Sequence, residues 1–200
     1  RLCPKDLAAE IFAELTPETQ QGLIDGLTDK ELKAVVDDLF VDDATDLVEE
    51  MPANVVKKVL QNADEGTRKT INQFLNYPEN SAGSLMTIEY VDLHDYFTVR
   101  KAMDYIRRTG IDKETIYTCY VTRGHKLIGL TSVKDLLLCE DDDATIESIM
   151  QEHVITVGTL DDKEQVAQMF SKYNFLALPV VDTENRLVGI VTFDDAMDVM

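Results

Sequence analysis

Apolar residues recur every twelve positions along roughly the first 75 residues of the chain. One column of apolar residues consists of Leu15, Leu27, Leu39, Met51, Ala63 and Leu75, and a second column lies four positions earlier, at Ile11, Leu23, Val35, Leu47, Val59 and Ile71. Residues four apart share one face of an α-helix. The pattern therefore predicts one short helix in each period, with both columns facing a common core.

Helix-start signals follow the first column. Thr16 precedes Pro17, which is the pairing of an N-cap with a proline at the first helical position. Thr28 and Glu31 have the spacing of a capping box. Helices this short cannot bury an apolar face alone, so we expect them to stack as a small superhelix of right-handed type.

The second half of the chain repeats itself after a turn-rich break at residues 76–83. Residues 126–135 match residues 186–195, and Leu85-Met86 matches Ile149-Met150. Each half is predicted to hold a strand-like stretch, a helix, two short strands around a glycine turn and a closing helix. The predicted elements are Val99–Arg108, Thr118–Thr122, Leu127–Thr131 and a helix from Ser132 in the first half, and Lys163–Tyr173, Ala177–Val181, Leu187–Val191 and a helix from Thr192 in the second.

Charge narrows the possible functions. The chain has 38 Asp and Glu against 19 Lys and Arg, a net charge of −19, which excludes most nucleic-acid-binding proteins. No apolar run approaches the length of a membrane-spanning helix. The three cysteines have no metal-ligand spacing, and we expect two of them to pack in cores. The three histidines are far apart, so a zinc site is not expected.

The acidity is concentrated in residues 37–50, where seven of fourteen residues are acidic and none is basic. Asp42, or Asp43, lies four or three residues before Asp46, so such a pair projects from one helix face, where like charges repel without a counterion. Carboxylate oxygens in this arrangement suit Mg²⁺ or Ca²⁺. The alternative interpretation is a solvated acidic face that only aids solubility. We find no nucleophile–histidine–acid set, phosphate-binding glycine loop or HExxH motif, so an enzyme is not expected.

Two motifs carry a family resemblance. The pattern hydrophobic-Gly-x-x-Ser/Thr-x-x-Asp, present at Gly129–Asp135 and Gly189–Asp195, is similar to the signature of CBS modules, which pair into a disc. An acidic helical repeat that leads through Tyr77–Tyr90 into such a pair resembles the cytosolic region of the MgtE family of Mg²⁺ transporters and channels. Matching stretches at Glu114–Tyr117 and Leu178–Asp182 extend the resemblance over nearly the whole chain.

The resemblance implies a fold, domains and ligands. The fold is an α plus α/β arrangement: a helical N domain at residues 1–80 and CBS modules at residues 81–146 and 147–200. The implied Mg²⁺ site residues are Asp42, Asp46, Ser84, Glu164, Asn174, Asp195 and Asp198. Asn174 departs from the family, which carries aspartate there. Some members also bind ATP in the CBS cleft, and the implied positions are Lys134, Asp135, Phe175 and Pro179. Thr118 replaces an aromatic residue found in some relatives.

The resemblance also implies partners and a location. We expect a homodimer formed through the CBS domains. A transmembrane pore is expected to follow outside these residues, and the 200 residues themselves are expected to lie on the cytoplasmic face of the cell membrane. Mg²⁺ is expected to close the helical domain onto the CBS pair and to hold the pore shut. Two further interpretations remain open: a CBS pair that senses adenine nucleotides for another effector, and a docking scaffold whose charge only aids solubility.

Overall fold

The chain folds into two compact units that divide between Asn76 and Tyr77. This computed structural model describes residues 5–198, without the side chains of residues 5–7, 10 and 198. The first unit is helical, and the second contains two three-stranded sheets with flanking helices. Cys3 lies outside the described residues, so the expectation for its thiol has no structural counterpart.

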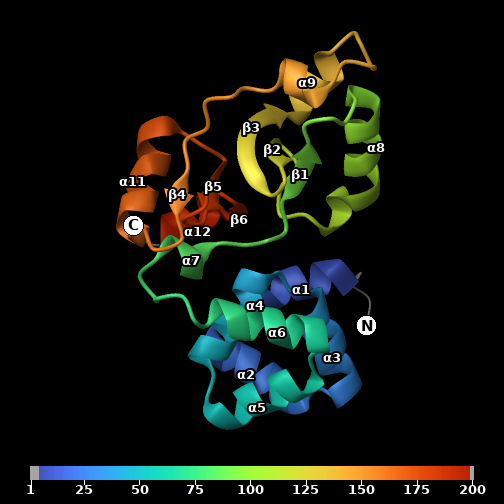
Figure 1. Ribbon diagram of the computed structural model, residues 1–200. Coiled ribbons are helices and arrows are strands. Elements are labelled where there is room, and N and C mark those ends of the chain that lie inside the picture. Colours follow the sequence, from blue (N-terminus) through green and yellow to red (C-terminus); the bar gives the residue numbers. More distant parts are fainter. Residues whose placement is uncertain (1–4, 199–200) are drawn as a thin grey trace. The chain divides into compact units, whose positions relative to one another are not determined.

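Short helices fill the first unit, as the period of twelve predicts (Figure 1). They are α1 (Lys5–Ala13), α2 (Pro17–Gly26), α3 (Asp29–Asp38), α4 (Val41–Glu50), α5 (Ala53–Asn62) and α6 (Glu65–Phe74). The predicted capping box is present, because the Thr28 side chain accepts from Glu31 N while the Glu31 carboxylate accepts from Thr28 N. The amide of Thr67 donates to the Asp64 side chain and caps α6 in the same way.

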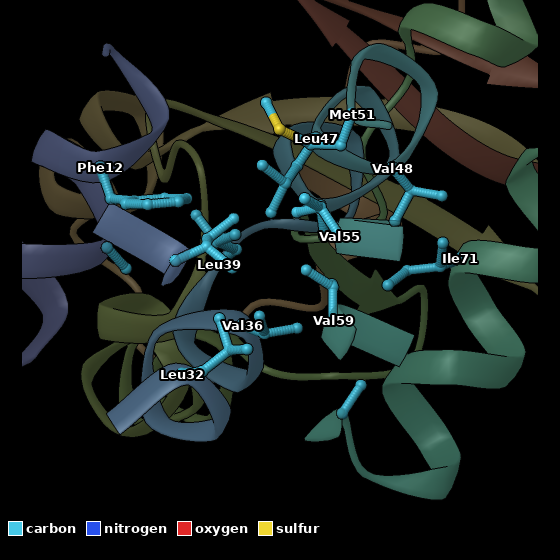
Figure 2. Close-up of a cluster of buried hydrophobic side chains, with 14 residues drawn as sticks. Phe12, Leu32, Val36, Leu39, Leu47, Val48, Met51, Val55, Val59 and Ile71 are labelled. Atoms are coloured by element: carbon cyan, nitrogen blue, oxygen red, sulfur yellow. The ribbon is translucent and has the colours of Figure 1, made fainter. Parts of the chain in front are cut away.

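The two predicted apolar columns are buried only in part. Leu39, Met51 and Ala63 of the first column are buried, and Leu47, Val59 and Ile71 are buried in the second (Figure 2). Ile11 and Leu23, however, are 51% and 45% exposed, so the prediction that the whole second column faces the core is wrong at its first two positions.

The core of α1 and α2 is supplied by the next residue along each helix. Phe12 and Ile24 are buried where Ile11 and Leu23 were expected, and Val36 and Val48 continue this third column. One residue turns a helix face by about 100°. The inward face therefore shifts along the repeat, from the third column in α1 to α3 to the second column in α5 and α6, which a fixed repeat cannot represent.

Each CBS-like half of the second unit has its own mixed sheet. In the first, β1 (Val91–His94) runs parallel to β2 (Thr118–Arg123), which is antiparallel to β3 (Lys126–Ser132). In the second, β4 (Val157–Gly158), β5 (Ala177–Val181) and β6 (Leu187–Thr192) repeat this order. We call the two halves the first and second modules.

Helices complete the modules, and they agree with the predicted ranges to within a residue or so. The remaining elements are α7 (Ala82–Leu85), α8 (Val99–Thr109), η1 (Gly110–Asp112), α9 (Val133–Leu138), α10 (Ile146–Ile149), α11 (Lys163–Tyr173) and α12 (Phe193–Asp198). Ser132 caps α9, and its side chain accepts from the amide of Asp135. No helix within residues 5–198 is long and apolar enough to cross a membrane.

The two modules share a core, so they form one body. Tyr120 and Leu127 of the first sheet pack with Ala177, Leu187 and Ile190 of the second. Cys119 is buried in the separate core between the first sheet and its helices, and Cys139 is half-buried against that core. These two thiols are packed as the sequence predicts.

Candidate functional site

The acidic face of α4 is the densest charged surface predicted from the sequence. Val41, Ala44, Leu47 and Val48 turn inward and fix the orientation of the helix. Its five acids alternate with them: Asp42 and Asp43 are half-buried, whereas Asp46, Glu49 and Glu50 are exposed. Asp42 and Asp46 lie one turn apart, where Cβ atoms are about 5–6 Å from each other.

The ends of α4 differ electrostatically. Asp42 and Asp43 occupy the first turn, where the helix dipole stabilises negative charge. Glu49 and Glu50 occupy the last turn, where the same dipole opposes them, and the helix sequence contains no basic residue. A cation beside this helix would therefore relieve repulsion along its length.

The candidate metal residues of the second unit fall into two groups at opposite ends of α11. Ser84 is half-buried in α7, a short helix that packs against α11. The amide of Ala82 donates to Asp161 O at 2.7 Å, which places this segment beside the first turn of α11, where Glu164 is exposed. Ser84 and Glu164 are thus near neighbours in the fold.

Asn174 and Asp195 form the other group. Asn174 ends α11 in the left-handed conformation, with φ 55° and ψ 43°, which asparagine tolerates better than most residues. Phe193 N donates to Leu176 O at 3.0 Å, which brings the start of α12 to this end of α11. Ten residues of helix separate Glu164 from Asn174, about 15 Å at 1.5 Å per residue, so the two cannot ligate one ion.

The Asp195 carboxylate is held in place by its own helix start. Its Oδ2 accepts from Thr192 Oγ1 at 2.5 Å and from Thr192 N at 3.3 Å. Asp195 is half-buried on the first turn of α12. Asp198 ends that helix, and its side chain lies outside the described part of the chain.

A fully caged metal site is not formed within residues 5–198: the described His, Cys, Asp and Glu side chains include no group of three that could hold an ion. The donor set of oxygens nevertheless suits Mg²⁺, which keeps several waters and takes one or two carboxylates from protein.

The candidate nucleotide residues lie in both modules. Lys134 and Asp135 are exposed on the first turn of α9, where the Asp135 carboxylate accepts from Ser132 Oγ at 2.6 Å. Pro179 is buried in β5, and Phe175 is half-buried just before that strand. The pairing of Asp135 with Ser132 repeats that of Asp195 with Thr192, as the internal duplication predicts.

Tyr117 is a candidate that the sequence analysis passed over. Its side chain is 68% exposed, and its carbonyl oxygen accepts from Val133 N at 3.2 Å at the start of α9. The backbone of Tyr117 therefore lies at the start of α9, the helix that carries Lys134 and Asp135. Tyr117 directly precedes Thr118, which is half-buried in β2.

Comparison with known families agrees with this architecture. The family model described as the MgtE intracellular N domain matches residues 1–80. The CBS domain model matches residues 146–200. The helical unit followed by a CBS pair is therefore the fold of this chain, as the sequence predicts.

Similar proteins cover the whole chain. A magnesium transporter MgtE from Thermus thermophilus is 38% identical over 204 residues, which are 100% of this chain and 45% of that protein. The chain thus spans less than half the length of that relative. A crystal structure of the cytosolic domain of the Mg²⁺ channel MgtE in complex with ATP superposes with a TM-score of 0.91 at 37% identity, covering 100% of this chain and 82% of the other. The soluble part of a magnesium transporter gives a TM-score of 0.92 at 32% identity, covering 98% and 78%. The chain therefore belongs to the MgtE family, whose members are transporters rather than enzymes.

Proposed function

We propose that this chain is the Mg²⁺-sensing regulatory region of a membrane Mg²⁺ transporter or channel whose pore lies outside these 200 residues. Support comes from similarity along the full chain to MgtE proteins and to the cytosolic domain of an MgtE channel. In this view the 200 residues bind the regulatory ion and transport nothing themselves.

Mg²⁺ acts by bridging carboxylates that repel each other when bare. Asp42 and Asp46 belong to the helical unit, whereas Ser84, Glu164, Asn174, Asp195 and Asp198 belong to the second unit. An ion held between the two sets binds only the closed arrangement, so it shifts the population toward closure by its differential affinity. Each site is weak because the ion keeps most of its waters, so several ions act together.

The observation that carries the proposal is the acidic face of α4. Five acids and no base occupy a ten-residue helix in a chain of net charge −19. Solubility alone does not call for two glutamates at the helix end where the dipole opposes them. A cation that neutralises this face accounts both for the five acids without a base and for the two glutamates at the C-terminal end of the helix.

Small-angle X-ray scattering of the chain tests the proposal. We expect the radius of gyration to fall as MgCl₂ is raised from zero to about 20 mM, and to stay constant in NaCl of equal ionic strength, because only the divalent ion bridges carboxylates. The double variant Asp42→Ala, Asp195→Ala should lose the response. A matched control, Asp112→Ala with Glu152→Ala, removes two exposed acids of the second unit and should keep it. A response unchanged in the first double variant would contradict the proposal.

The assembly we propose is a homodimer formed through the CBS domains and joined to the chain's own transmembrane domain. Apolar side chains exposed on α9 and α12 support it, since Leu137 and Leu138 are 64% and 68% exposed and Met197 is 41% exposed. Sedimentation equilibrium checks this part of the proposal: a mass of one chain at all concentrations would contradict it.

A second candidate function is the binding of ATP by the CBS pair. It is favoured by the ATP complex of a similar cytosolic domain and by the exposed side chain of Tyr117, whose backbone lies at the start of the helix that carries Lys134 and Asp135. Titration calorimetry with ATP should give binding that weakens at least tenfold in Asp135→Ala and in Tyr117→Ala, as expected for the loss of a ribose contact or a stacked ring. Unchanged binding in both variants would place the nucleotide elsewhere.

A further inference from the structure

The segment that joins the two units packs on the second module, although the first module follows it in sequence. Ala82 N donates to Asp161 O at 2.7 Å, Gly83 N to Thr159 O at 2.9 Å, and Lys163 N to Asn80 O at 3.1 Å. Figure 1 shows the same arrangement: α7, in green, lies at the edge of the orange and red second module, where it contacts α11, β4 and β6.

The first module is completed in the same way by the segment that follows it. Ile146 N donates to Phe97 O at 2.8 Å, Glu147 N to Asp95 O at 3.0 Å, and Val99 N to Ala144 O at 3.0 Å. Every donor and acceptor is displaced by 64 positions from its counterpart in the second module. The two connecting segments are therefore equivalent pieces of structure, and each precedes one module in sequence but packs on the other.

The equivalence continues into the sheets. Thr87 exchanges two backbone hydrogen bonds with Ile190 of β6, at 2.8 and 2.9 Å, and Gln151 exchanges two with Leu130 of β3, at 2.8 and 3.0 Å. Residues 80–87 are thus tied to the second module at both ends. Movement of that module must carry this segment with it.

One position breaks the equivalence. Glu147 occupies it in the first module and reaches out to bind Arg123 Nη2 at 2.6 Å. Gly83 occupies it in the second module, so the packing itself does not demand glycine. A Cβ atom at Gly83 would instead lie 2.6 Å from Cδ1 and 2.7 Å from Cγ of Tyr77. Thr159 O would also lie 2.9 Å from this Cβ, but the two nearest atoms belong to the Tyr77 ring, which lies over the glycine.

Tyr77 stands where the chain enters the second unit. Helix α6 ends at Phe74, and only Leu75 and Asn76 precede the boundary. After the ring, Pro78 O accepts from Ser81 N at 3.0 Å and from Ser81 Oγ at 2.7 Å, which closes a tight turn back to Gly83. Burial raises the pKa of the Tyr77 phenol, as expected for a ring covered by protein.

We propose that Tyr77 and Gly83 form a clasp that fixes the direction in which the chain leaves the second module toward the helical unit. Tyr77 is a positioning residue: it acts through the direction of the backbone, and in the proposed function it sets how freely the acids of α4 can search for Asp195. The link to Mg²⁺ rests on the proposed function, whereas the clasp itself does not.

The test measures the spread of distances between the units without any ion. Fluorophores are placed at Lys57→Cys on α5 and Ser171→Cys on α11, both exposed, in a Cys3→Ser, Cys139→Ser background, and time-resolved energy transfer is recorded in EDTA. We expect Tyr77→Ala to widen the distance distribution by roughly twofold, because a longer free linker samples a larger volume. Tyr77→Phe keeps the ring and should keep the wild-type width.

Two further variants separate the clasp from general damage. Gly83→Ala should widen the distribution as Tyr77→Ala does, because the new Cβ displaces the ring. Glu147→Ala at the equivalent position of the first module should leave it unchanged. A wild-type width in Tyr77→Ala, with both units folded by circular dichroism, would overturn the clasp. Adding MgCl₂ afterwards tests the proposed function separately, since a wild-type distribution that does not shift would count against ion-driven closure only.

Discussion

The buried side chain of Gln20 completes the hydrogen bonding at the end of α1. Its Nε2 donates to Phe12 O at 3.0 Å and to Ala13 O at 3.2 Å, and the residue is only 6% exposed. The last carbonyl groups of a helix have no partner within the helix. A side chain from the next helix therefore replaces the missing turn and ties α1 to α2.

Gln20→Leu keeps the volume of this side chain and removes both donors. The carbonyl oxygens of Phe12 and Ala13 then lose a partner in a buried place, so we expect the free energy of unfolding of the helical unit to fall by about 1–3 kcal/mol. Urea denaturation followed by circular dichroism measures the change. Gln61→Leu, on the exposed side of α5, is the matched control, and an equal loss in both variants would contradict the assignment.

Arg123 links two acids across the first module and sets a pH dependence. Its Nε donates to Asp95 Oδ2 at 2.6 Å and its Nη2 to Glu147 Oε1 at 2.6 Å. The hydrogen bond from Arg123, aided by its charge, lowers the pKa of Asp95. A carboxylate with a lowered folded-state pKa contributes stability above its unfolded pKa, near 3.9, and loses it as pH falls through the folded value.

Asp95→Asn should therefore be less stable than wild type at pH 7 and should approach it as pH falls from about 5 toward 3. The urea midpoint of the second unit, measured across this range, gives the difference. All three side chains are at least partly solvated, so salt should shrink the gap. A gap that stays constant down to the acid limit would show that the carboxylate acts through shape rather than charge.

Helices and strands were predicted well where local signals decide them. Pro17 and the Thr28 capping box mark helix starts by chemistry that needs no distant partner, and α11 and β5 have the predicted bounds. The rotation of α1 and α2 about their axes was missed because packing against other helices decides it. The exchange of segments between the modules was missed for the same reason, since Thr87 finds its partner at Ile190, far along the chain.

The residue types of the candidate site can be chosen from the sequence, whereas the distances between them cannot. Glu164 and Asn174 lie at opposite ends of α11, a separation that follows from the bounds of this helix. The distance between two residues on one helix follows only after the first and last residues of that helix are known. Tyr117 was missed because it precedes a buried strand and its exposure depends on the start of α9.

Gly189→Ala tests the packing of the connecting segment, residues 80–87, against β6. An added Cβ would lie 2.7 Å from Met86 Sδ and 2.9 Å from Thr87 O, so the connecting segment must shift. We expect a loss of about 1–3 kcal/mol in the free energy of unfolding of the second unit, typical of overpacking. Gly158→Ala is the control, because its Cβ would meet Asp161 atoms only at 3.5 Å or more.

A double-mutant cycle identifies the cause of that loss. Met86→Ala creates room for the new Cβ, so the combined variant should be more stable than the sum of the two single changes predicts. Simple additivity would mean that the crowding with Thr87 O, rather than with the methionine sulfur, carries the cost.

The division into two compact units determines how the chain should respond to its ion. A ligand that needs carboxylates from both units stabilises their closed arrangement, so it raises the unfolding temperature of the less stable unit only while the other is folded. A ligand held by α4 alone would stabilise the helical unit whichever substitution is made in the second unit. The two cases differ in a variant that alters only the second unit.

Asp195→Asn supplies that variant, because the amide still accepts from Thr192 through its oxygen but no longer attracts a cation strongly. In wild type, Mg²⁺ at about ten times its dissociation constant should add about 1.4 kcal/mol for each shared site. That addition corresponds to a rise of roughly 5–10 °C in the melting temperature of a helical unit of this size. Asp195→Asn should lose most of that rise without changing the melting temperature in EDTA, and Asp112→Asn should keep it. If Asp195→Asn retained the full rise, Mg²⁺ would be bound by the helical unit alone, and the bridging mechanism would have to be abandoned even though the chain still bound the ion.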